Sequence, residues 1–76
     1  QVIVDHEVAI KIQNALTVLG FYQGPITGEY DTLTMKAFSD FCGIENYEER
    51  INEGNIVDIN VLKALIKKAR AKNNIS

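Results

Sequence analysis

Apolar residues recur at helical spacing in three stretches of the chain. The first stretch predicts a helix over residues 7–19, because its apolar positions repeat every three or four residues and so share one face. Asp5 precedes this helix as its N-cap, and Gly20 follows it where a left-handed residue is wanted. The apolar face consists of Val8, Ile12, Ala15, Leu16 and Leu19.

The other two stretches predict helices in the middle and at the end of the chain. One begins at Asp31 or Thr32 and runs to about Cys42, where Gly43 ends it; its apolar face consists of Leu33, Ala37, Phe38, Phe41 and Cys42. The other is capped by Asp58 and runs to about Arg70, with an apolar face of Leu62, Leu65, Ile66 and Ala69.

Glycine and proline exclude a helix between the first two stretches. Residues 20–31 still carry four large apolar side chains, so we expect a compact, anchored loop there: Phe21, Tyr22, Ile26 and Tyr30. Residues 44–57 are the least regular, with one short helical turn around Tyr47 and Ile51 and a turn at Gly54-Asn55.

Together these elements predict an all-α fold, a small three-helix bundle with two structured loops. We expect residues 1–6 to be a lead-in or linker, residues 7–71 to be the domain and residues 72–76 to be a frayed tail.

Size and composition favour a binding or interaction module over an enzyme. The 76 residues allow one domain, and no apolar run approaches the roughly 20 residues of a membrane-spanning helix. One Cys excludes an intramolecular disulfide, and no metal-ligand motif is present, so we expect no metal and no cofactor. Cys42 falls on an apolar helix face and His6 lies at the start of the chain, so we do not expect them to form a nucleophile–base pair.

Charge is unevenly distributed along the chain. The net charge is −2, but residues 1–62 carry −7 and residues 63–76 carry +5. A basic end can indicate a nucleic-acid partner, but cations also complement the dipole at the end of a helix. We prefer the second interpretation, because the acidic remainder of the surface would repel phosphates, and we expect no nucleic-acid partner.

Several segments together resemble the peptidoglycan-binding domain family, the three-helix modules appended to many cell-wall hydrolases. The resemblance covers roughly residues 8–66, with Thr27 where the family often has Asp and Cys42 where it often has Gln. It rests on Ile12-Gln13-Asn14-Ala15-Leu16, Leu19-Gly20-Phe21-Tyr22, Gly24, Gly28, Tyr30, Thr34, Ala37, Phe41, Gly54-Asn55-Ile56, Asp58, Leu62 and Leu65.

Residues 45–50, Glu-Asn-Tyr-Glu-Glu-Arg, resemble a variant of this domain found at the C-terminal end of Ntn-hydrolase-like proteins of unknown function. That resemblance, with the start at Gln1, implies that the domain is a piece of a longer chain. It also implies an alternative role, an intramolecular or oligomeric interaction domain of an Ntn-hydrolase-like enzyme with no glycan ligand.

The wider resemblance implies a non-catalytic module that binds peptidoglycan or muropeptides and holds a catalytic domain of the same chain near the wall. A wall-binding role implies an extracellular or periplasmic location, and the Ntn-hydrolase context a cytoplasmic one. We expect a shallow site formed by the loop after the first helix and the start of the third helix.

Five residues have side chains suited to such a ligand. Aromatic rings stack on sugars, amides pair with glycan and peptide groups, and a guanidinium grips a carboxylate. The candidate ligand contacts are Tyr22, Gln23, Asn46, Tyr47 and Arg50.

Each candidate also has a structural alternative: Tyr47 could cap the end of the core, and the amides of Gln23 and Asn46 could be structural or solvated. Tyr22 could cap the core, and Arg50 could pair with Glu45 or Asp40. We expect Tyr30 to pack inward, and Gln13 could satisfy backbone groups of the loop from its helix face.

Overall fold

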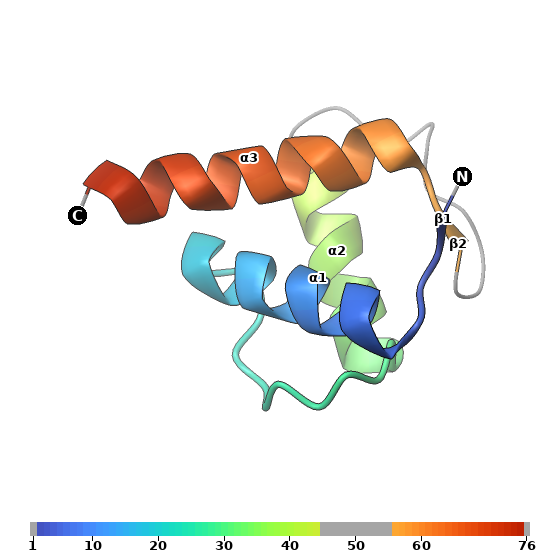
Figure 1. Cartoon of the computed structure of the whole chain (residues 1–76). Coiled ribbons are helices and arrows are strands. Elements are labelled where there is room, and N and C mark those ends of the chain that lie inside the picture. Colours follow the sequence, from blue (N-terminus) through green and yellow to red (C-terminus); the bar gives the residue numbers. More distant parts are fainter. Residues whose placement is uncertain (1, 45–55, 76) are drawn as a thin grey trace.

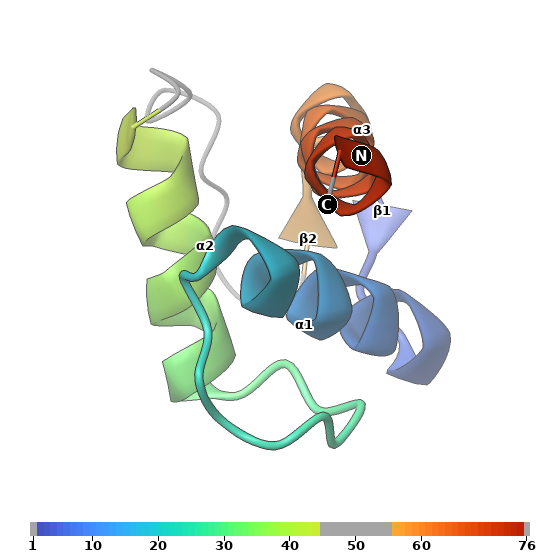
Figure 2. The ribbon, with the colours of Figure 1, turned by 90° about the vertical axis from the view of Figure 1, so that its left-hand side faces the viewer.

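The computed structural model of the chain describes residues 2–44 and 56–75, with side chains to residue 73. Its elements are β1 (Val2–Ile3), α1 (His6–Leu19), α2 (Thr32–Ile44), β2 (Ile56–Val57) and α3 (Ile59–Ile75). Figures 1 and 2 show α3 lying over α1, with α2 beside both and the loop of residues 20–31 below α1. The predicted all-α three-helix module is therefore confirmed, with a short strand pair added to it.

Helix α1 begins and ends where its local signals place it. The Asp5 carboxylate accepts a hydrogen bond of 2.9 Å from the Val8 amide, which satisfies a free donor of the first turn. Gly20 adopts the left-handed conformation at φ 87°, and its N–H donates to the carbonyls of Leu16 and Thr17. Both caps agree with the prediction from the sequence.

Helix α2 runs past the predicted stop. Gly43 lies inside the helix, which the structure follows to Ile44. A glycine inside a helix costs only about 1 kcal/mol relative to alanine. Phe41 and Cys42, in the same turn, are almost fully removed from water, so this turn of α2 packs against the core.

The first residues belong to the folded unit instead of preceding it. β1 pairs antiparallel with β2, with Val2 opposite Val57 and Ile3 opposite Ile56. Val4, directly after β1, is buried in the core. The lead-in expected over residues 1–6 thus contains a paired strand and a buried side chain, and the pairing connects segments too distant for sequence periodicity to relate.

Helix α3 extends to Ile75, past its expected end at about Arg70, and the fraying expected for residues 72–76 stays a prediction. Ala69 is buried, and Asn73 lies with Val18 of α1 along one groove. Helix α3 therefore packs on α1 as far as Ala69 and Asn73, and packing on another element supplies most of the stability of a short helix.

The core fills the space between the three helices and is lined by aromatic rings at one end. Phe21 of the loop meets Phe41 of α2 edge-on, with ring centroids 5.9 Å apart. Tyr30 is half-buried and meets Phe38 in the same manner at 6.5 Å, as the inward packing predicted. Burial, with a smaller contribution from nearby Cys42, raises the pKa of Tyr30 to about 12.

Asp31 caps α2 through Thr34. Its Oδ1 accepts from the Thr34 hydroxyl at 2.7 Å and from the Thr34 amide at 2.9 Å. Both bonds favour the charged carboxylate, and they hold the pKa of Asp31 below its usual value, the hydroxyl bond contributing most.

We expect this cap to make folding sensitive to acid. The unfolded pKa of Asp is about 3.9, so the stabilisation is present above that pH and is lost as the pH falls through the lower folded value. Thermal melts between about pH 5 and pH 2 should therefore fall more steeply for the native sequence than for Asp31→Asn, which keeps an acceptor but cannot titrate. Identical slopes for the two proteins would contradict this account of the cap.

Candidate functional site

One buried amide holds the loop of residues 20–31, which we call the anchored loop. Gln13 is fully buried on the face of α1 that meets this loop. Its Oε1 accepts from the backbone N–H groups of Thr27 and Gly28, both at 3.0 Å. Its Nε2 donates to the Glu29 carbonyl at 2.9 Å and to the Thr34 hydroxyl at 3.0 Å. The structural role predicted for Gln13 is therefore confirmed.

Tyr22 is a second anchor of the same loop and not a surface residue. Only 2% of it is exposed, and its hydroxyl donates to the Pro25 carbonyl at 2.7 Å. The ring lies so close to Gly24 that a Cβ there would approach the Tyr22 hydroxyl to 2.8 Å. Neither the ring face nor the hydroxyl of Tyr22 is therefore available to a ligand, and Tyr22 as a ligand contact does not fit the structure. The alternative, that Tyr22 caps the core, agrees with its burial.

The other sequence-predicted contacts fall into two groups. Gln23 is exposed on the anchored loop, where a ligand could reach it. Asn46, Tyr47 and Arg50 lie outside the described residues.

The expected shallow site does not form between the anchored loop and the start of α3. Figures 1 and 2 show the two segments on opposite sides of α1. The Gln13 contacts draw the loop to one side of α1, while α3 packs on the other side. The helix therefore separates two surfaces that the sequence interpretation had joined.

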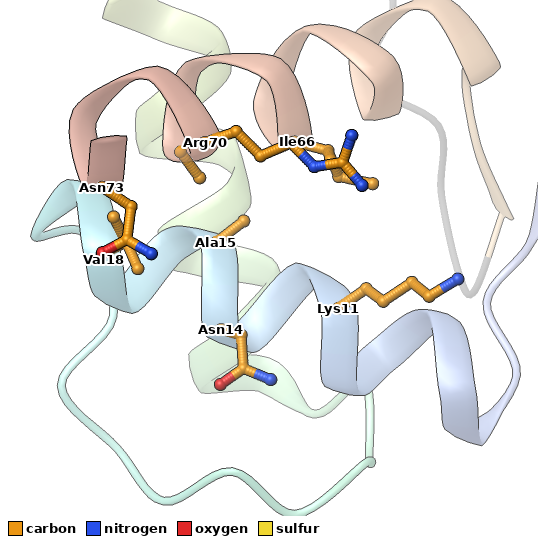
Figure 3. Close-up of a pocket in the computed structure, with 8 residues that line it drawn as sticks. Lys11, Asn14, Ala15, Val18, Ile66, Arg70 and Asn73 are labelled. Atoms are coloured by element: carbon orange, nitrogen blue, oxygen red, sulfur yellow. The ribbon is translucent and has the colours of Figure 1, made fainter. Parts of the chain in front are cut away.

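A groove lies instead between α1 and α3, with a volume of about 310 Å³ (Figure 3). Each helix contributes four lining residues at the same offsets, i, i+3, i+4 and i+7, which is one face of a helix. They are Lys11, Asn14, Ala15 and Val18 from α1, and Ile66, Ala69, Arg70 and Asn73 from α3.

The groove has an apolar lining and a positive charge. Figure 3 shows the Arg70 side chain running along α3 toward Ile66, while Lys11 extends along α1 in the direction of the strands. Both charged lining residues are cations, and within residues 2–44 and 56–73 no ion pair holds either of them. The groove therefore favours an anion that carries apolar groups.

The sequence interpretation missed this groove. The signal was present in two parts, the excess of positive charge after residue 62 and the matching spacing of the two lining sets. Nothing in the sequence alone shows that these two helix faces oppose each other.

The described residues do not place Cys42 and His6 as a pair, and they hold no cluster of metal ligands. Cys42 is fully buried among core side chains. His6 lies at the start of α1 over Gly28 of the anchored loop, where an added Cβ would overlap its imidazole. No cluster of three or more potential metal ligands occurs in the described part of the chain. Within that part, no helix combines the length and apolarity needed to cross a bilayer.

Comparison with known proteins shows the family of the chain. No curated protein and no solved structure matches the chain. A family model described as "Putative peptidoglycan binding domain" matches residues 1–65, which covers β1, both helices that hold the anchored loop, β2 and the first part of α3. The chain therefore belongs to this peptidoglycan-binding domain family.

Proposed function

We propose that the domain binds peptidoglycan as a non-catalytic module of a larger protein. The observation that carries the proposal is the family match, which extends over almost all of the folded unit. The described surface supports it, since it offers an open groove lined by amides and cations and an exposed amide at Gln23. Peptidoglycan presents amide and carboxylate groups that such side chains can bind.

The benefit of such a module is effective concentration. A weak binding site that is tethered to a catalytic domain keeps that domain near its polymeric substrate, so affinity in the millimolar range is already useful. The module itself then needs no reactive side chain, and a catalytic domain of the same chain is the partner we propose.

The ligand contacts that we propose from the sequence are Gln23, Asn46, Tyr47 and Arg50. Tyr22 is left out because it is buried. Gln23 lies on the anchored loop, which α1 separates from the groove, so the proposal allows for contacts on two sides of α1.

A second candidate is an interaction domain that docks on protein and binds no glycan. Exposed apolar side chains on α2 favour it, since Leu33 is 52% exposed and Ile44 is 66% exposed. This candidate predicts a domain that self-associates or binds a neighbouring domain and ignores the cell wall.

Cosedimentation with purified sacculi tests the proposed function. We expect the 76-residue chain to pellet with sacculi, to remain in solution with microcrystalline cellulose of equal mass, and to be released by an excess of soluble muropeptides. Equal partition onto cellulose and sacculi, or none onto either, would refute wall binding. Sedimentation equilibrium on the same sample then tests the interaction-domain candidate, which predicts a dimer or larger species.

A further inference from the structure

We infer that the groove between α1 and α3 binds the terminal carboxylate of a short peptide with small apolar side chains. The identification of this ligand with the free end of a peptidoglycan stem peptide rests on the proposed function. The lining, the charge and the position of the groove support the inference independently of that function.

The lining sets the size of the ligand. Ala15 and Ala69 are small and nearly buried, so they leave space between the two helices that larger side chains would fill. Val18 and Ile66 are half-buried and add apolar contact from each helix. A groove of about 310 Å³ with this lining fits methyl-sized side chains and is at the lower limit for a drug-sized molecule.

The charge sets the chemistry of the ligand. Arg70 presents a planar fork of N–H donors that can hold a carboxylate with two parallel hydrogen bonds. Lys11 adds a second positive charge from the opposite helix. Asn14 is exposed at the rim, and its carboxamide can donate to and accept from a peptide group. An apolar lining next to these cations favours a carboxylate attached to an apolar residue over a bare inorganic anion.

The surroundings of the groove strengthen its preference for anions. Six of the eight cations of the chain lie on α1 and α3: Lys11, Lys63, Lys67, Lys68, Arg70 and Lys72. The acidic residues of the described surface lie mainly elsewhere, on the anchored loop and α2 and at the start of α1. A net positive potential near the groove raises the local concentration of an anionic ligand, and salt screens the effect.

Titration of the ¹⁵N-labelled chain with matched peptides tests the inference. The probes are diacetyl-L-Lys-D-Ala-D-Ala, its C-terminal amide, the disaccharide chitobiose and inorganic phosphate. We expect the acid to shift the backbone amides of Ala15, Val18, Ile66 and Ala69, and the amidated peptide to bind about tenfold more weakly because it lacks the charge. Binding of the acid should also weaken as salt is raised.

Two single substitutions on α3 supply the variant and its control. Arg70→Gln should raise the dissociation constant for the acid about fivefold, the effect of losing one exposed ion pair. Lys67→Gln removes the same charge from an exposed position of the same helix outside the groove, and it should leave the constant unchanged. Both positions are exposed, so both variants should melt close to the native chain.

The outcomes separate the inference from the proposed function. Equal binding of acid and amide, equal effects of the two substitutions, competition by phosphate at the concentration of the acid, or shifts confined to the anchored loop would each overturn the inference. Sacculus binding without shifts in the groove would overturn the inference and leave the proposed function standing. Specific binding of the acid without sacculus binding would support the groove as a carboxylate site and refute the proposed function.

Discussion

Replacement of Gln13 by leucine is expected to leave the domain mostly unfolded. Leucine preserves the approximate volume but cannot accept from the Thr27 and Gly28 amides or donate to the Glu29 carbonyl. Each buried polar group left without a partner costs about 1–3 kcal/mol, so the total loss is about 3–5 kcal/mol. A core of this size supplies a net stability of about 3–5 kcal/mol, so little of it would remain.

The measurement is urea denaturation followed by circular dichroism. Asn14→Leu is the matched control, because it makes a similar change at the next residue of the same helix, where the side chain is exposed. We expect this control to change the free energy of unfolding by less than about 0.5 kcal/mol. Similar losses for the two variants would mean that the Gln13 contacts do not hold the loop.

Removal of the Tyr22 ring is the second change with a large expected effect. Tyr22→Ala deletes one of the largest fully buried side chains, and truncation of a buried aromatic residue costs about 3–5 kcal/mol. Tyr22→Phe keeps the ring and loses the hydroxyl, which donates to the Pro25 carbonyl and accepts from Gln13 Nε2 at 3.4 Å, so a loss of about 1 kcal/mol is expected.

The same pair of variants tests whether Tyr22 contacts a ligand. Because the hydroxyl is used inside the loop, Tyr22→Phe should pellet with sacculi as the native chain does. Reduced sacculus binding by a Tyr22→Phe protein that is fully folded at the temperature of the assay would restore Tyr22 as a ligand contact. Equal losses of stability for Tyr22→Ala and Tyr22→Phe would contradict the burial of the ring.

The parts of the fold that the sequence predicts are those with local causes. The caps at Asp5 and Gly20 act within four residues of themselves, so residue type and spacing are sufficient to place them. The role of Gln13 was also foreseeable, because an amide on the loop side of a helix has both a donor and an acceptor to offer.

The parts of the fold that the sequence does not predict include contacts between distant segments. Gly43 lies within α2 next to the buried Phe41 and Cys42, and α3 continues to Ile75, past its expected end at about Arg70. The pairing of Val2 with Val57 has no local signal at all. The strand pair in particular is a tertiary contact, which residue type and spacing cannot predict.

The candidate site likewise depends on a contact between distant segments, the packing of α1 on α3. Residue type drew attention to tyrosines and to residues 45–50, whereas the groove is made of lysine, arginine, asparagine and small apolar residues that look ordinary one by one. What makes them a candidate site is the opposition of two helix faces, and that is a property of the packed chain.

The strand pair has a consequence for the order in which the domain assembles. Val2 and Val57 are about 55 residues apart, so closing this contact is entropically costly until α1 and α3 have docked, whereas the bonds of Gln13 span only 14 to 16 residues. The pair should therefore form last in folding and open first in native-state hydrogen exchange. While β1 is detached, the backbone N–H and C=O groups along the edge of β2 have no strand partner. Strand exchange between two copies of the chain then becomes the characteristic route to misassembly.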